Sequence, residues 1–541
     1  MPDTAHDDEK PGRPAAEDGR RIVAELQEAL LPTALPVLPQ ARIAARYLVA
    51  GHELAAGGDW FDAIPLADGT VALIVGDLVG HGLAASAAMG QLRAVLAELL
   101  AAEKDLEHVL KRVDAYAARV PALRAATLVL AVLDPADGKL RYTTCGHPPP
   151  LVVGPEGTAR YLQGTATGPL GTGSAPVLAD DRLASGELVL LYSDGLVERP
   201  DHTMSEGLAE LAAVAADAAA SRPGQPGADP AVPERVCQLT VEQLTRAGHA
   251  DDITVLAAQW VADPVPALHL ELPSRRPSLT KARDAFAGWL SRLDAAADDW
   301  EALHLAMVEV FTNAIEHAYP SDHPGNVELD ARLGDDGYVE CRVTDQGTWR
   351  PPNPSDADRG HGLMVAGQVV DGLLVSHESE APESGTGAAA DSGAGVSLRA
   401  VARTAVGTTV ALRHRLRRPA ILASGHRREQ AAQPAGPPFS VDTSIAAGAT
   451  ARAQVRGPVD INTADKLARR LLSVSRGGTV PLVADLTGVT QLASAGVRAL
   501  YAVSGQLAAH GNSLILITAP GSGAGVVLDL VQLAHVTGAE A

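Results

Sequence analysis

The sequence predicts a multidomain protein that combines α+β and α/β folds, and three observations lead to this. Its 541 residues correspond to about three or four domains of roughly 150 residues each. Short apolar runs of strand length alternate with helical runs along the chain, as in "TVPLVADL" and the "AGVRALYAVSGQL" that follows it. A stretch that is first basic and then Pro-rich, at 416–438, separates the last block from the others.

The order of the segments follows from composition and spacing. A polar, Pro-bearing tail at 1–20 is predicted to be disordered. A helix is predicted over 21–37, with a stripe of apolar residues formed by Ile22, Val23, Leu26, Leu30 and Leu31. This stripe either dimerises the chain or packs on its own domain, and the sequence leaves both open. The remaining segments are a first block at 38–262, a second at 266–415 with a flexible insertion at 378–395, a linker at 416–438, and a third block at 439–541.

Charge and composition exclude several classes of protein. The net charge of −21 argues against nucleic-acid binding, which depends on Lys and Arg at the phosphates. Only 3% of residues are aromatic while 46% are hydrophobic, so we expect cores built of Ala, Val and Leu. Three isolated cysteines fit neither a disulfide framework nor a zinc site. Because no secretory signal or membrane-spanning run is found, we expect a cytoplasmic protein that is not bound to a membrane.

Carboxylates flank short apolar strands in the first block. Asp77 ends "VALIVGD" and Asp194 ends "ELVLLYSD", while Asp59 lies in "GGDWFD" and Asp251 opens "DDITVLAA". Such residues often only cap turns. Carboxylates gathered from several strand ends also hold Mg²⁺ or Mn²⁺, and two such ions activate a water between them. From spacing alone, both interpretations stay open.

Five motifs occur in order along this block: "GGDWFD", "GDLVGHG", "CGHPPP", "LLYSDGLVE" and "DDIT". With them, the segment at about 21–261 resembles the bacterial metal-dependent PPM-type serine/threonine phosphatases of the stress-response and sporulation branch. The resemblance implies an α/β/β/α sandwich with two Mn²⁺ or Mg²⁺ ions. It implies that Asp77 bridges both ions. Asp59 and the backbone carbonyl of Leu78 would complete one metal site, and Asp194 and Asp251 the other.

Other polar residues of the same motifs are given supporting roles. His81 and His147 lie in turns rich in Gly and Pro, and we expect them to brace these turns rather than to bind metal or act as acids. Asp62, Asp252 and Glu198 are expected to support the ligands or the fold without contacting an ion.

The second block contains a helix with an unusual polar face. In "DDWEALHLAMVEVFTNAIEHAY", Glu309, Asn313 and His317 are four residues apart and share one face. An Asn can reach Mg²⁺, and a Glu one turn earlier can take the proton of an attacking hydroxyl. Downstream, a strand ends in Asp345-Gln-Gly347, and "RGHGL" forms a Gly-rich turn at a helix start, where phosphate binds readily.

The segment at about 266–415 resembles the GHKL ATPase superfamily, above all the serine-kinase anti-sigma factors. The resemblance lies in four nucleotide boxes: Glu309–Asn313, Asp345–Gly347, Gly360–Gly362 and Gly407-Thr408. This implies a Bergerat-type α/β sandwich that binds Mg-ATP. Asn313 would hold Mg²⁺, Asp345 would bind the adenine amino group, and Glu309 would be the kinase base. The other nucleotide-binding residues would be Gly347, Gly360, Gly362 and Thr408. "DQGTW" and the insertion depart from the usual pattern and bear on kinase activity more than on nucleotide binding. No hairpin with a phosphoacceptor His precedes the boxes, which argues against a sensor histidine kinase.

The third block has a serine at a helix start. Ser494 precedes "AGVRAL" and, on physical grounds alone, is a helix N-cap. The strand, turn and helix here resemble the STAS domains of anti-anti-sigma factors, over about 439–541, in which the serine at this point is phosphorylated. Ala493 stands where an Asp is usual, and Ala495 where a second hydroxyl residue is usual. The resemblance implies that Ser494 is a phosphoacceptor, and a phosphate there would add about two negative charges to a docking surface.

The three resemblances together imply a function. The chain would be a phosphatase of phosphorylated STAS domains, fused to an ATP-dependent serine kinase and to a STAS domain, and would regulate a sigma factor by partner switching. The expected partners are a STAS-type anti-anti-sigma protein, in the same chain or another, and a sigma factor. The alternative is an active phosphatase whose other two domains only bind regulatory partners.

Overall fold

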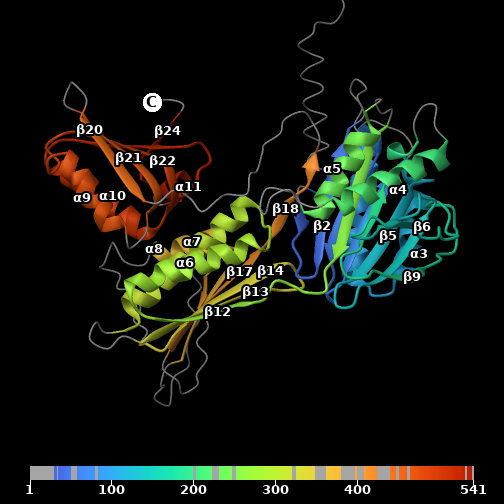
Figure 1. Cartoon of the computed structure of the whole chain (residues 1–541), viewed down its shortest axis with the longest axis horizontal. Coiled ribbons are helices and arrows are strands. Elements are labelled where there is room, and N and C mark those ends of the chain that lie inside the picture. Colours follow the sequence, from blue (N-terminus) through green and yellow to red (C-terminus); the bar gives the residue numbers. More distant parts are fainter. Residues whose placement is uncertain are drawn as a thin grey trace, which may run out of the picture. The chain divides into compact units, whose positions relative to one another are not determined.

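In the computed structural model, the chain folds into two compact units (Figure 1). The first lies within residues 1–264, 335–337 and 417–429, and the second within 265–334, 338–416 and 430–541. The structure describes residues 30–32, 34–49, 58–78, 83–198, 203–221, 231–246, 251–319, 325–347, 361–378, 396–398, 407–422, 439–445, 450–459, 463–530 and 533–538. The tail predicted at 1–20 and all but the first residue of the insertion predicted at 378–395 lie outside this part. Among the helices in these ranges, none has the length and apolar character needed to cross a membrane.

The first unit is an α/β/β/α sandwich, as predicted. Its strands are β1 (Ala34–Pro36), β2 (Ala41–Leu48), β3 (Trp60–Pro65), β4 (Val71–Asp77), β5 (Thr127–Asp134), β6 (Lys139–Cys145), β7 (Leu151–Val153), β8 (Ala159–Tyr161), β9 (Ala179–Arg182), β10 (Leu188–Tyr192), β11 (Ile253–Trp260), β18 (Arg417–Pro419) and β19 (Ile421–Leu422). Its helices are α2 (Leu83–Ala102), α3 (Leu106–Arg119), α4 (Met204–Ala220) and α5 (Val232–Leu244). One large sheet has the strand order β3-β4-β5-β6-β9 and the other β19-β2-β11-β10-β7-β8, while β1 and β18 form a separate two-stranded sheet.

Two apolar cores hold these layers together. In the first, α2 and α3 pack with the two sheets, and in the second, α4 and α5 pack on the other face of the β10–β11 sheet. Both α4 and α5 are visible on that sheet in Figure 1. All five residues of β10 and the first six of β4 are buried. Because both faces of these strands are covered, their sequences are continuous apolar runs rather than alternating ones.

Two segments differ from the prediction. The helix expected over 21–37 does not reach its predicted end, because Ala34–Pro36 forms β1; Pro32 and Pro36 lack the N–H that a helix needs. The stretch predicted as a linker at 416–438 begins with β18, which pairs with β1, and β19, which pairs with β2. Six residues after the second predicted block are therefore part of the first unit's fold.

The second unit contains two sheets. The first has the order β12-β13-β14-β17-β15-β16 and is formed by β12 (Leu268–Pro273), β13 (Asn326–Leu333), β14 (Tyr338–Asp345), β15 (Gly372–Glu378), β16 (Val396–Leu398) and β17 (Gly407–Arg415). Its helices are α6 (Arg276–Ser291), α7 (Ala297–His317) and α8 (His361–Val369), and Figure 1 shows α6 and α7 along one face of the sheet. This is the two-layer α/β sandwich expected for the second block.

The other sheet of this unit belongs to the third predicted block. It has the order β20-β21-β22-β23-β24, with β20 (Ser440–Ile445), β21 (Ala451–Val459), β22 (Leu482–Leu492), β23 (Leu514–Thr518) and β24 (Val536–Thr537). Its helices are α9 (Ala464–Val474), α10 (Ser494–Ala509) and α11 (Gly523–Leu530). Leu305 of α7 and Val365 of α8 lie in the same buried cluster as the core of this block. The second and third predicted blocks therefore form one compact unit.

Candidate active sites

Strands β3 and β4 bring Asp59 and Asp77 to the same end of a sheet. The strands are antiparallel with Trp60 opposite Gly76, so the residues next to this pair are neighbours. A Cβ on Gly76 would overlap the ring of Trp60, and glycine is therefore required for this pairing. Asp59 is only 3% exposed, and Leu78, which follows Asp77, is 2% exposed.

Strands β10 and β11 bring Asp194 close to the Asp251-Asp252 pair. Tyr192 lies opposite Val255, which places the residues after β10 beside those before β11. Asp194 begins a short 3-10 turn. A Cβ on the next residue, Gly195, would overlap the backbone oxygen of Asp252, so this glycine allows the two segments to approach.

Burial and nearby carboxylates raise the pKa values of Asp59, Asp77 and Asp194. Burial and the charge of Asp77 raise the pKa of Asp59 well above its usual value. Burial and the charge of Asp194 raise the pKa of Asp77 to about 7, and a hydrogen bond shared with Asp59 opposes this increase. Burial, Glu198 and Asp251 raise the pKa of Asp194. The structure thus brings the predicted ligands into electrostatic contact, with a repulsion that a divalent cation would relieve.

The donor chemistry fits Mg²⁺ or Mn²⁺, which prefer carboxylate and water oxygens. The geometry of a closed metal site is not formed: among the residues that the structure describes, no three His, Cys, Asp or Glu side chains are arranged to hold an ion. Asp59 is buried, Asp77 and Asp194 are half-buried and Asp251 is exposed, and the ligand set stays a prediction.

Two hydroxyl groups that hold Asp59 were not identified from the sequence. Thr254 Oγ1 donates a hydrogen bond to Asp59 Oδ2 at 3.2 Å. The Ser193 hydroxyl also hydrogen-bonds to Asp59 and lowers its pKa. Since Ser193 Oγ accepts the backbone N–H of Thr254 at 2.9 Å, its own proton is directed to the carboxylate. Both residues are adjacent to predicted ligand motifs, in "YSDG" and "DDIT", which was the available indication.

His147 holds the end of β10. Its Nε2 donates to the backbone oxygen of Tyr192 at 3.0 Å, and its Nδ1 then accepts from Thr127 Oγ1 at 2.8 Å. Burial lowers the pKa of His147 to about 4, so the ring is neutral at pH 7. His147 thus positions the backbone at Tyr192, two residues before Asp194. His81, to which a similar role was assigned, lies outside the described residues.

Asp62 is connected to Leu30 through Arg93. It lies on β3, and its Oδ2 is 2.8 Å from Arg93 Nε on α2. Arg93 Nη1 in turn donates to the backbone oxygen of Leu30 at 2.7 Å. Leu30 and Leu31 pack on the core of the first unit, so the described end of the predicted helix contacts its own domain.

In the second unit, Asp345 ends β14 opposite Thr408 of β17. Its carboxylate accepts the backbone N–H of Gly347 at 2.9 Å and that of Thr408, while burial raises its pKa. A Cβ on Gly347 would overlap the backbone oxygen of Ala318, so this glycine lets the turn after β14 pack on the end of α7. A carboxylate held in this way has a fixed direction, as recognition of a base amino group requires.

The polar face of α7 has a buried and an open end. Glu309 is 1% exposed, Asn313 is half-buried, and His317 is exposed. Tyr319, just beyond α7, accepts the backbone N–H of Gln346 at 2.7 Å and thus ties the helix to the Asp345 turn. α8 packs against α7 and has Gly362, which is buried, in its first turn. Gly360 lies outside the described residues.

Ser494 is the first residue of α10. The N-cap position falls on Ala493, one residue earlier than predicted from the sequence, and no side chain caps the helix. Arg498, one turn further on, has its Nη2 3.5 Å from Glu316 Oε2 of α7. This ion pair links the first turns of α10 to α7, the helix that carries Asn313. Leu305 of α7 and Val365 of α8 add apolar contacts to the core of the last block.

Three parts of the chain match known families. Residues 67–261 match Stage II sporulation protein E (SpoIIE), residues 272–386 match the histidine kinase-like ATPase domain, and residues 445–538 match the Mlab STAS domain. The first match covers Asp77, Asp194 and Asp251, the second covers Asn313 and Asp345, and the third covers the start of α10.

Individual proteins are similar to the same parts of the chain. The anti-sigma F factor of Clostridium botulinum is 30% identical over 124 residues, which are 21% of this chain and 86% of that protein. Protein IcfG of Synechocystis sp. is 28% identical over 214 residues, or 34% of this chain, and the chain spans only 32% of that protein. The crystal structure of the RsbU and RsbW domains of Rv1364c from Mycobacterium tuberculosis is 35% identical, covers 74% of this chain and 99% of that structure, and superposes with a TM-score of 0.62.

Proposed function

We propose that the chain is a metal-dependent phosphoserine phosphatase fused to an ATP-dependent serine kinase. It belongs to the family in which a SpoIIE-type PPM phosphatase domain precedes an anti-sigma-factor-type ATPase domain, and here a STAS domain follows. Its substrate would be a phosphorylated STAS domain, and its output the activity of a sigma factor. The observation that carries the phosphatase assignment is the group formed by the buried Asp59 and the half-buried Asp77 and Asp194, whose pKa values are raised by burial and by nearby carboxylates.

In the phosphatase, Asp77 would bridge two Mn²⁺ or Mg²⁺ ions. Asp59 and the Leu78 carbonyl would complete one site, and Asp194 and Asp251 the other. When bound, the ions supply charge neutralisation for the phosphate and an activated water. Ser193 and Thr254 would fix the direction of the Asp59 carboxylate through the hydrogen bonds described above; these two hydroxyls are positioning groups.

In the kinase, Asn313 would hold Mg²⁺ and Asp345 the adenine amino group, with Gly347, Gly360, Gly362 and Thr408 around the nucleotide. Glu309 would take the proton of a serine hydroxyl. The serine oxygen would then form a bond to the γ-phosphorus of ATP while the bond to the leaving ADP breaks. Glu309 is 1% exposed and lies one turn before Asn313 on α7, which supports this role by position.

The serine that supports this scheme best is Ser494 of the same chain. Arg498 and Glu316 hold the first turns of α10 near the C-terminal half of α7, on which Glu309 and Asn313 lie. The cluster around Leu305 fixes the same docking with apolar contacts. Partner proteins in other chains would be a separate STAS-type anti-anti-sigma protein and a sigma factor, and a homodimer through the N-terminal helix is a further expectation. The alternative, with two non-catalytic binding domains, is not favoured by the similarity to anti-sigma factors.

The experiment that tests this uses the full chain with Asp77→Ala and, as a control, with Asp180→Ala, an exposed carboxylate that pairs with Arg141. After incubation with Mg-ATP, mass spectrometry should find phosphate on Ser494 in the Asp77 variant, and unaltered chain with Mn²⁺ should remove it. The Asp180 variant should retain phosphatase activity. Absence of phosphate from Ser494, with ATP bound, would leave the third block as a docking domain.

A further inference from the structure

The six residues after Leu416 add strands to two sheets of the first unit. In β18, Arg418 lies opposite Leu35 of β1, and in β19, Ile421 and Leu422 lie beside Arg46 and Tyr47 of β2. On its other side β2 pairs with β11, so without β19 it would be the edge of its sheet. An edge strand presents unpaired N–H and C=O groups and accepts an added strand.

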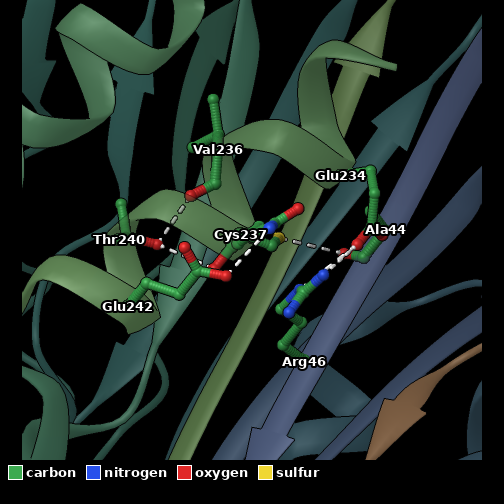
Figure 2. A network of polar contacts seen from close by, with 8 residues as sticks. Ala44, Arg46, Glu234, Val236, Cys237, Thr240 and Glu242 are labelled. Atoms are coloured by element: carbon green, nitrogen blue, oxygen red, sulfur yellow. Dashed lines mark hydrogen bonds and ion pairs between the residues drawn. The ribbon is translucent and has the colours of Figure 1, made fainter. Parts of the chain in front are cut away.

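The added segment is also held by charge and by apolar contact. Glu234 of α5 accepts two hydrogen bonds from Arg46, at 3.2 Å from Nε and 2.7 Å from Nη2, and Figure 2 shows this pair beside β2. Burial lowers the pKa of the neighbouring Arg418, and the charge of Glu234 opposes that effect while Arg42 adds to it. Ala420, between β18 and β19, packs on the first core of the unit. A carboxylate on α5 thus attracts arginines from both the sheet edge and the added segment.

The added strand is two strands away from the candidate metal site. Leu422 pairs with Tyr47, and Tyr47 pairs with Thr254 of β11. Thr254 Oγ1 donates to Asp59, and the same strand begins two residues after Asp251. Tyr47 is 1% exposed and Thr254 is fully buried, so displacement of one strand is transmitted to the next by close packing.

We propose that residues 417–422 are a docking strand, supplied by the same chain, that keeps the β2–β11 pair in the register needed for phosphatase activity. Only Leu416 separates this strand from β17, which carries Thr408 of the nucleotide site. The phosphatase sheet is therefore completed by the continuation of a strand of the kinase-like domain. Its activity should depend on whether that strand is seated, which goes beyond the phosphatase function proposed above while relying on it.

A proline in β19 tests the docking strand in the full chain. Ile421 is 37% exposed, so Ile421→Pro removes strand pairing while it changes little of the core, and Ile421→Thr is the matched control that keeps a β-branched residue. In hydrogen–deuterium exchange, the proline variant should exchange about tenfold faster in 417–422 and in 45–48. Its phosphatase rate should fall by about tenfold, because Asp59 loses a rigid support. The proline variant should bind ATP as the unaltered chain does. The Ile421→Thr control should match the unaltered chain in exchange and in phosphatase rate.

A second pair of variants tests the charge that holds the segment. Glu234→Gln should have the same effects as Ile421→Pro in smaller measure. Glu242→Gln, on the same helix α5, removes an exposed carboxylate that accepts a hydrogen bond from Gln238 of that helix, and it should have none of these effects. If exchange in 45–48 is unchanged in Ile421→Pro, or rises with no loss of phosphatase rate, the proposal is wrong. A chain that hydrolyses no phosphoserine at all would contradict the proposed function, and the exchange data would still decide whether the strand is docked.

Cross-linking decides whether the strand comes from the same chain. Ala34 lies opposite Pro419 in the β1–β18 pair, so the double variant Ala34→Cys and Pro419→Cys should be joined within one chain by a short bis-maleimide. The three native cysteines are buried and give a low background. A product within the monomer is the expected result. A dimeric product would show that a second copy supplies the strand, and absence of any product would show that the strand is not seated; either would overturn the proposal.

Discussion

Replacement of Thr254 by valine should raise the Mn²⁺ concentration that half-activates the phosphatase. Valine keeps the shape of threonine and leaves no cavity, but removes the hydroxyl that donates to Asp59 Oδ2 at 3.2 Å. A hydrogen bond to a buried carboxylate contributes about 1.5–3 kcal/mol, and each 1.4 kcal/mol is roughly tenfold in affinity. Loss of a group that orients a metal ligand typically costs about 10–100-fold in metal affinity. We therefore expect a shift of about ten- to a hundredfold.

The assay is hydrolysis of a phosphoserine peptide by the full chain over a range of Mn²⁺ concentrations, with calorimetric Mn²⁺ binding as a readout that does not depend on turnover. Thr240→Val is the control, because Thr240 is also fully buried but donates to carbonyl oxygens of its own helix. The control should match the unaltered chain. A half-activating concentration in Thr254→Val within about twofold of the control would refute a positioning role for this hydroxyl.

Three further predictions concern the other parts of the chain. Asn313→Ala should weaken ATP binding about tenfold in Mg²⁺ and leave metal-free binding unchanged in calorimetry. Arg498→Glu should slow phosphorylation of Ser494, and the added change Glu316→Arg should restore it, because the charges are then exchanged rather than lost; equal rates in all three chains would contradict the docking. If the N-terminal helix dimerises the chain, Leu26→Asp should convert the dimer to a monomer in sedimentation, and a strictly monomeric unaltered chain would exclude this.

The strand ends of the candidate phosphatase site could be predicted from the sequence because the chemistry is local. Asp77 and Asp194 each end an apolar run, and the glycines beside them, Gly76 and Gly195, mark the places where other chain segments approach closely. The hydroxyls around Asp59 could not be predicted in the same way. Thr254 and Asp59 are 195 residues apart in sequence, and their contact depends on how the sheet that contains β11 packs on the sheet that contains β3 and β4.

The segment at 417–422 was missed for a different physical reason. Strands of two and three residues are too short to show a period, and a run rich in Arg and Pro has the composition of a linker. Its structure is decided by its partner, since the open edge of β2 and the charge of Glu234 lie in sequence far before it. The packing of Leu305 and Val365 into the third block was missed because each reads as an ordinary core residue of its own helix.

A chain that carries both a kinase and a phosphatase for Ser494 would consume ATP without net change if both were active together. One of the two activities must therefore be restrained when the other acts. The phosphatase is the one whose site depends on a segment outside its own continuous sequence, because β19 supports β2, and β2 supports the strand of Thr254. The same segment continues directly from the strand that carries Thr408. Regulation of the phosphatase through the seating of β18 and β19 thus needs no sensor domain, and places the control where the two activities are covalently joined.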